Sequence, residues 1–330
     1  MFTDPVVEAI IRSQLAIDAG AGISADDVLM IEDFSDDAPA LLQSDGNRLI
    51  IYSLDDLKHC SNLKSVALCD QSIANLDGLR DLSLLESVVI IDCALLNDIS
   101  PLSEMKHLQQ AVLLSTPIQE YGPVLALDSL TTFVASGFFT TQDLSPLTAT
   151  SNLEKFFLRG VTAETDYTPL RNHRKMKEVE LSFIDPAAFR ELVSSFPDLR
   201  MFDISHSAII GGDLAALSSH VLTHVKLYRC NIIDDLYPFS SHAEMQALYI
   251  VECNLADIGF VENMTSLATV DLRGNPVRDF TPLFHLPNLQ KLIISQSDGI
   301  DEDELRKNLP NTEIVLGLYH QADIPSQIAR

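Results

Sequence analysis

The chain has 330 residues, of which 46% are hydrophobic, and it carries 47 acidic against 22 basic side chains, a formal net charge of −25. This apolar content supplies a core and argues against disorder. Nucleic acids and anionic membrane surfaces are bound through Lys and Arg, so we expect neither as a partner.

The first sixty-two residues predict a helical cap followed by a first strand. Thr3-Asp4-Pro5 is typical of a helix start, and the apolar residues of 6–17 follow helical spacing. A second short helix is expected from Ser24. Its inward-facing residues would be Val28, Leu29 and Ile31. Leu49–Tyr52 then predicts an irregular strand.

The N-terminus and the cysteines bear on location. Acidic residues stand where a secretory signal peptide has positive charges before a long apolar stretch. The five cysteines have irregular spacing, with no CxxC pair and no Cys/His metal pattern. Unless processing has trimmed the chain, we expect a cytoplasmic protein with reduced thiols, no metal and no other cofactor.

Residues 63–317 are dominated by an internal repeat of 22 or 23 residues on the pattern L-x-x-L-x-L. The eleven units begin at Leu63, Leu85, Leu108, Leu130, Leu153, Met176, Leu199, Leu222, Met245, Leu267 and Leu289. The fourth and sixth positions of each unit are apolar, which is the period of a short strand with one buried face. Such strands must stack as a parallel sheet, because one unit cannot bury its apolar face alone.

The second half of several units has the form Ser/Thr-Pro-Leu. It starts at Ser100, Ser145, Thr168 and Thr281, with looser versions at Gly122 and Tyr237. A Ser or Thr cap followed by Pro favours a helical turn. We therefore expect short 3₁₀ segments on the outer side of each coil, capped by the Ser or Thr.

Together these motifs resemble the leucine-rich repeat family, most closely its internalin-like branch with a 22-residue unit. The regulatory subunits of eukaryotic protein phosphatases use a similar unit. The resemblance implies an α/β fold, a right-handed solenoid with a parallel sheet on its concave face, 3₁₀ or turn segments on its convex face and a helical N-terminal cap. We expect the cap and first strand in residues 1–62, about eleven repeats with a C-terminal capping strand in 63–317, and a loosely held tail in 318–330.

In that family the ninth position of each unit is usually Asn or Cys, whose side chains bond to the backbone in a buried ladder. Here the ninth residues are Gln71, Cys93, Thr116, Phe138, Val161, Ile184, Ser207, Cys230, Cys253, Asn275 and Ser297. The fourth to sixth units have no polar residue at this position, so we expect irregular or wider coils near residues 138–190. We interpret the ladder cysteines as structural.

The C-terminal end of the chain and its lack of catalytic motifs complete the outline. The acidic run 301–304 before Leu305 and Leu309 predicts a helix, and Ile314–Leu316 a last strand. There is no G-x-S-x-G elbow, Walker A loop or H-E-x-x-H motif. We therefore expect no catalytic residues and a protein that is not an enzyme.

The strand positions that point away from the core line the concave face, and there we place the partner-binding residues. An apolar patch is expected from Val89, Ile91, Val112, Leu114, Val134 and Phe157. Polar and aromatic contacts are expected from Arg159, Lys226, Tyr228, Tyr249 and Arg273. Two alternatives to partner binding stay open. The apolar residues can be there only because β-branched residues favour strands, or a neighbouring loop can cover the patch.

Three functions fit these observations. The first is a non-enzymatic recognition module that binds a protein partner through the concave face, with Phe157, Tyr228 and Tyr249 as anchors. The second is an acidic cytoplasmic inhibitor or immunity-type protein that neutralises a basic toxin or nuclease, with strongly salt-dependent affinity. The third is a structural role in which the solenoid forms a homo-oligomer through a sheet edge or the apolar patch.

Overall fold

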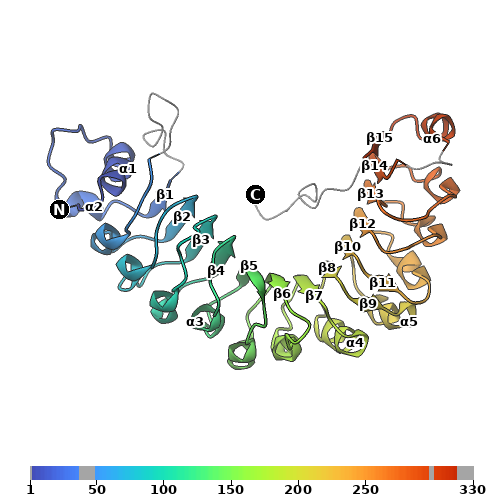
Figure 1. The fold of residues 1–330 in the computed structure, drawn as a ribbon, viewed down its shortest axis with the longest axis horizontal. Helices are drawn as coiled ribbons and strands as arrows, with labels where there is room; N and C mark the ends of the chain where they lie inside the picture. Colours follow the sequence, from blue (N-terminus) through green and yellow to red (C-terminus); the bar gives the residue numbers. More distant parts are fainter. Residues whose placement is uncertain (1, 37–48, 297–300, 318–330) are drawn as a thin grey trace. The chain divides into compact units, whose positions relative to one another are not determined.

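The computed structural model describes residues 2–36, 49–296 and 301–317. They belong to two compact units, residues 1–176 and 177–330. In each unit the chain winds in coils with a strand on one side and, in most coils, a short helical segment on the other (Figure 1). Strands of successive coils pair in parallel, which is the solenoid that the repeat predicts. Within the described ranges, no helix is both long and apolar enough to span a bilayer.

The sheet of the first unit contains six strands that pair in chain order within the described residues. They are β1 (Asp33–Ser35), β2 (Ser65–Cys69), β3 (Ser87–Ile91), β4 (Gln110–Leu114), β5 (Thr132–Thr140) and β6 (Lys155–Val161). The α-helices are α1 (Pro5–Leu15), α2 (Ala25–Val28) and α3 (Gly122–Leu125). The 3₁₀ segments are Asp55–His59, Asp77–Leu79, Ser100–Glu104, Ser145–Ala149 and Thr168–Asn172.

The second unit repeats this plan with seven strands in the part of the chain that the structure describes. They are β7 (Glu178–Ser182), β8 (Met201–Ser205), β10 (His224–Tyr228), β12 (Ala247–Val251), β13 (Thr269–Asp271), β14 (Lys291–Ile294) and β15 (Glu313–Leu316). Two short strands, β9 (Ala208–Ile209) and β11 (Asn231–Ile232), form a separate parallel pair. The helices are α4 (Pro186–Ser195), α5 (Gly211–Leu214) and α6 (Glu302–Asn308), and the 3₁₀ segments are Ala215–Leu217, Tyr237–Ser241, Gly259–Val261 and Thr281–Leu283.

The repeated apolar positions form the core between the sheet and the outer segments. In the unit that begins at Leu267, Val270 and Leu272 are 0% and 2% exposed. Burial of one such side chain contributes about 1.5–3 kcal/mol. Each coil buries only a few of them, so the stack as a whole rather than any single coil stabilises the fold.

The outer helical turns are confirmed, but their caps differ from the prediction. Ser100 occupies the first helical position, and its N–H donates to Asp98 Oδ1 at 2.8 Å. Equivalent contacts at 2.9 Å join Asp143 to Ser145, Asp166 to Thr168 and Asp279 to Thr281. The first N–H of each turn is therefore bonded by a carboxylate two residues before it, which lies just outside the N-cap position and suits the positive end of a helical turn. The turn at Gly122 is α-helical rather than 3₁₀.

Two buried carboxylates hold the N-terminal cap. Asp4 Oδ1 accepts the Val6 N–H at 2.8 Å at the start of α1, as the sequence predicts. Its other oxygen accepts the Tyr52 N–H at 3.0 Å. Asp56, 4% exposed, accepts the N–H groups of Thr3 and Asp4 at 2.7 Å. The bonds of Asp4 to Tyr52 and of Asp56 to Thr3 join the first helix to the first coil, because their partners lie about fifty residues apart in the sequence.

Two details of the predicted cap are wrong. Leu49–Tyr52 is not a strand, since Ile51 N–H donates to the Gln71 side chain and Tyr52 N–H to Asp4. The first strand is β1, which has only one core residue, Phe34, and is too short to show a period of two. Leu29 is 39% exposed, whereas Val28 and Ile31 are buried as predicted.

The irregular coils expected near residues 138–190 are present. Between β5 and β6 the register shifts, because Ser136 pairs with Arg159 but Thr140 pairs with Val161. Further on, α4 takes the place of a short 3₁₀ segment, and its N-cap Asp185 accepts the Ala187 N–H at 2.9 Å. Both changes fall where the ladder positions are apolar.

At the C-terminal end, the predicted helix and last strand are α6 and β15. Asp301 caps α6 by accepting the Glu304 N–H at 2.9 Å. The tail predicted for residues 318–330, the ladder residue Ser297 and the side chain of Phe138 lie outside the described part of the structure.

Candidate functional site

The open face of each sheet, defined as the face opposite the core, is where the predicted partner-binding residues lie. In the first unit, parallel register aligns one residue from each strand on this face. This apolar row consists of Ala67, Val89, Val112, Val134 and Phe157. A shorter row of Cys69, Ile91 and Leu114 runs beside it.

The apolar row is more closed than the sequence suggests. Val112, Val134 and Phe157 are 4%, 2% and 4% exposed. The remaining patch residues, Val89, Ile91 and Leu114, are half-buried. Neighbouring side chains in register cover one another, and the Lys155 ammonium lies 4.7 Å from the centre of the Phe157 ring. The six residues therefore do not form the exposed patch that was expected, and their role in binding stays a prediction.

Arg159 ends the open face of the first unit. It is half-buried on β6 and pairs in register with Ser136 of β5. It lies two residues after Phe157 on the same strand, at the last aligned pair before the register shift.

In the second unit the aligned residues are charged and aromatic. This charged row consists of Glu180, Asp203, Lys226, Tyr249 and Asp271. Lys226 Nζ lies 2.6 Å from Asp203 Oδ2, and the two side chains are 16% and 11% exposed. Such partial burial strengthens the pair relative to an exposed one.

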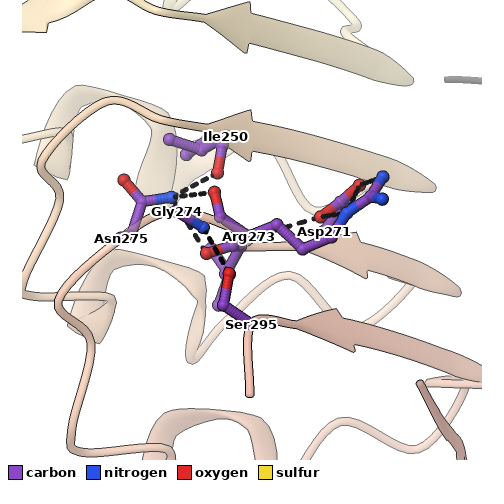
Figure 2. A network of polar contacts seen from close by, with 7 residues as sticks. Ile250, Asp271, Arg273, Gly274, Asn275 and Ser295 are labelled. Carbon is purple, nitrogen blue, oxygen red and sulfur yellow. Dashed lines mark hydrogen bonds and ion pairs between the residues drawn. The ribbon is translucent and has the colours of Figure 1, made fainter. Parts of the chain in front are cut away.

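A second ion pair lies at the far end of the charged row. The Arg273 guanidinium contacts both carboxylate oxygens of Asp271, with Nε at 3.0 and 3.1 Å and Nη2 at 2.7 Å (Figure 2). Asp271 and Arg273 are only 1% and 4% exposed. The half-buried Tyr249 is aligned between Lys226 and Asp271, and burial, with a smaller effect of Asp271, raises its pKa. The phenol therefore stays protonated at neutral pH and able to donate a hydrogen bond.

Next to this row, a rim row follows the strand ends. It consists of Phe183, His206, Arg229 and Glu252, all with left-handed backbone, φ between 51° and 57°. The His206 ring stacks on Phe183 with centroids 5.0 Å apart. Arg229 lies 5.0 Å over the Tyr228 ring and bonds to Glu252 at 2.6 Å. Burial and the nearby Arg229 lower the pKa of His206.

The rim row was missed by the sequence reasoning. Bulky residues in the left-handed backbone region carry a steric cost. The equivalent positions of the first unit hold smaller residues, namely Asp70, Asp92, Ser115 and Gly160. The left-handed backbone allows a hydrogen bond between adjacent coils. At His206, for example, the backbone N–H donates to the Tyr228 C=O at 2.9 Å. The available signal was the change from small or acidic residues to Phe183, His206 and Arg229 at the eighth position of three successive units.

Tyr228 and the ladder cysteines lie deeper. Tyr228 is 5% exposed and meets the His206 ring edge-on at 5.4 Å. Cys93, Cys230 and Cys253 are buried, and their Sγ atoms lie 3.2–3.7 Å from backbone carbonyls. Burial raises the pKa of the Cys93 thiol to about 11. The geometry supports the structural interpretation of these cysteines, because each thiol is buried and lies against backbone carbonyls of the ladder.

Asn275 bonds more backbone groups than any other ladder side chain that the structure describes. Its Oδ1 accepts the N–H groups of Cys253 at 3.1 Å and Leu255 at 2.9 Å. Its Nδ2 donates to the carbonyls of Ile250, Leu272 and Arg273 (Figure 2). This one side chain fixes the turn that follows the Asp271–Arg273 pair.

Two concave sites that could receive a small ligand lie at the loops of the first unit. A polar hollow of about 390 Å³ opens between two loops of the first unit, lined in part by Asp98, Gln119 and Glu120. An adjoining hollow of about 260 Å³ also borders Gln119. Among the described residues no group of three His, Cys, Asp or Glu side chains is arranged to hold a metal ion.

No protein-family model matches the chain, and no curated protein is significantly similar to it in sequence. Its fold is similar to that of an internalin, InlF, from Listeria monocytogenes, with 20% identity, a TM-score of 0.69, and 97% of this chain and 90% of that chain covered. A leucine-rich repeat protein from Leptospira interrogans aligns with 14% identity and a TM-score of 0.55, and 82% of each chain is covered. The internalin-like leucine-rich repeat solenoid expected from the sequence is thus confirmed.

Proposed function

We propose that this protein is a non-enzymatic recognition module whose open face, in residues 177–317, binds a protein partner. The observation that carries the proposal is the charged row, in which two ion pairs flank Tyr249 in strict register. The core does not require charged residues there, and buried ion pairs are weak devices for stability. Fixed charges around an aromatic side chain are, however, suited to orienting a partner.

Accessibility decides which residues make the contacts. Tyr228, Arg273 and Phe157 are at most 5% exposed and act as supports beneath the surface. Tyr249 and Lys226 are half-buried, and Arg229 is exposed at the neighbouring rim. Tyr and Arg are the commonest residues in interface hot spots. We therefore assign the central contacts to Tyr249 and Arg229, with Lys226 setting the register of the partner.

The charge distribution bears on the alternative of an inhibitor that neutralises a basic toxin or nuclease. The acidic residues Asp203 and Asp271 of the open face are engaged with Lys226 and Arg273. Most of the 47 acidic residues that give the net charge of −25 lie outside the charged row, whose acidic members are Glu180, Asp203 and Asp271. Binding through this face should depend weakly on salt, whereas an inhibitor that neutralises a basic target by charge should lose affinity steeply as salt is added.

The test is affinity capture from a lysate of the source organism at low and at high salt. Wild type is compared with Tyr249→Ala and with Tyr237→Ala, a control at a 50% exposed tyrosine in an outer 3₁₀ segment of the same unit. A protein retained by wild type and by the control but lost from Tyr249→Ala at both salt concentrations supports the proposal. Retention by all three variants, or loss of the protein at high salt alone, contradicts it.

A further inference from the structure

The two terminal strands of the sheets differ in how their core residues are covered. Phe34, the core residue of β1, is 0% exposed, and α1 packs beside this strand. At the other end, Ile314 pairs in register with Leu292, which is 0% exposed, yet Ile314 itself is only half-buried. Val315 and Leu316 are half-buried too. Within the described residues, β15 has a strand on one side only.

The free edge of β15 presents specific backbone groups. Glu313 N–H donates to Gln290 C=O at 2.8 Å and Gly317 N–H to Ile294 C=O at 3.1 Å, both toward β14. Because successive residues of a strand alternate, the N–H and C=O of Ile314 and Leu316 point away from β14. An edge of this kind is a template for another strand.

We propose that β15 pairs with β15 of a second copy of this chain, antiparallel about a two-fold axis at Val315. In this register Ile314 lies opposite Leu316 of the second copy, and the two residues exchange both hydrogen bonds, which gives four bonds in all by symmetry. The half-buried core-face side chains of Ile314 and Leu316 then cover those of the second copy. The inference is independent of the proposed function.

Charge favours this register over its neighbours. Glu313, which bonds to Lys291 at 3.3 Å, would lie opposite Gly317 of the second copy, so no like charges meet. The same rotation turns the two α6 helices antiparallel. The acidic first turn of one α6 helix, residues 302–304, is then at the same end of the dimer contact as the basic last turn, Arg306 and Lys307, of the other α6 helix. A shift by two residues would place Glu313 against Val315 and lose the match of Ile314 with Leu316.

The contact is small and two copies each carry a net charge of −25, so we expect a weak dimer that is strengthened by salt. The repulsion between two net charges of −25 outweighs the local attraction between the α6 turns, so this sign is opposite to that of an association held by unlike charges alone. A nonspecific ionic contact would weaken as salt is added, so the salt dependence distinguishes it from the proposed dimer.

The test is sedimentation velocity of the full chain over a range of concentrations, at low and high ionic strength. Leu316→Pro removes an N–H that faces the free edge rather than β14, and Ile314→Lys adds a charge at the same edge. Each should raise the dissociation constant of the dimer at least about tenfold. Thr269→Lys, on the inner strand β13, is the matched control and should leave it unchanged.

A cysteine at the axis tests the register itself. In an antiparallel pair, directly opposite residues approach closely, so Val315→Cys should form a disulfide-linked dimer under mild oxidation, whereas Thr269→Cys should not. A wild-type monomer at every concentration and salt, or a dimer that Leu316→Pro and Ile314→Lys leave intact, would overturn the proposal. The first outcome would mean that another segment or another protein covers β15.

Discussion

Lys226 and Asp203 face each other across β10 and β8, with Nζ 2.6 Å from Oδ2, on the open face of the sheet. Their side chains are 16% and 11% exposed, although no core demands their charge. Because the pair is partly desolvated, removal of one partner leaves the other charge in a poor environment.

Lys226→Met should therefore lower the free energy of unfolding by about 1–3 kcal/mol. The double variant Lys226→Met/Asp203→Asn should lose less than the sum of the two single variants, since it no longer buries a lone charge. Urea unfolding measures all three. Lys64→Met is the matched control, because the Lys64–Glu32 pair has the same 2.6 Å distance but side chains 44% and 56% exposed. It should change stability by at most about 1 kcal/mol, and an equal loss in both lysine variants would refute this argument.

The solenoid was predictable because its signal repeats. The apolar positions of eleven units each specify the same strand, so chance matches are averaged out and the parallel sheet follows. The first strand was not predictable, since β1 contains one core residue, Phe34, and belongs to no full repeat. The outer caps were predicted wrongly because Ser and Thr are strong caps in general, whereas here the Asp98 carboxylate accepts the first N–H of the turn.

The candidate site was predictable only in part. The alternation along each strand correctly placed Tyr249 and Lys226 on the open face. It did not predict that Phe157 and Val134 are buried, because burial there depends on which side chains lie in register on adjacent coils. The rim row depends on a left-handed backbone that large residues such as Phe183 seldom adopt, so propensity gave no indication of it.

Asn275→Ala should destabilise the second unit by at least about 2 kcal/mol, because each buried backbone group left without a partner costs about 1–3 kcal/mol. Asn275 satisfies two N–H groups and bonds three carbonyl oxygens. Asn275→Asp should be similarly damaging, as its carboxylate would face those carbonyls. Thermal unfolding followed by circular dichroism measures the loss. Asn288→Ala, at an exposed asparagine with one bond to Thr265 C=O, should have little effect, and comparable losses at both positions would contradict a special role for the ladder.

Acidification should weaken the fold through His173. Its Nδ1 accepts the Leu153 N–H at 3.3 Å and its Nε2 lies 3.2 Å from Leu147 C=O, inside the core. Burial lowers the pKa of His173 below its ordinary value of 6.5, although the bond to Leu147 opposes the shift. The unfolded chain therefore binds the proton more readily. The stabilising contribution is complete above pH 6.5 and is lost as the pH falls through the lower folded-state pKa.

His173→Gln should accordingly flatten the dependence of unfolding free energy on pH just below 6.5, whatever its effect on absolute stability. Denaturant titrations at a series of pH values measure this slope. His107→Gln, at an exposed position, should leave the slope as in wild type. An unchanged slope in His173→Gln would assign the acid sensitivity to other groups.

Gly78→Ala should test how tightly adjacent outer segments pack. Gly78 lies in the 3₁₀ segment Asp77–Leu79, and a Cβ atom built there would overlap the Leu54 carbonyl of the preceding coil. Since that neighbour is backbone rather than a flexible side chain, relief requires the coils to separate, and overpacking of this kind costs about 1–3 kcal/mol. Gly212→Ala is the matched control, because no atom lies within 4 Å of the added Cβ. It should be neutral or stabilising by about 0.4–1 kcal/mol, through the lower entropy of the unfolded chain. Chemical denaturation measures the free energy of unfolding of both variants. Equal values would mean that the outer segments pack loosely enough to accommodate one extra methyl group.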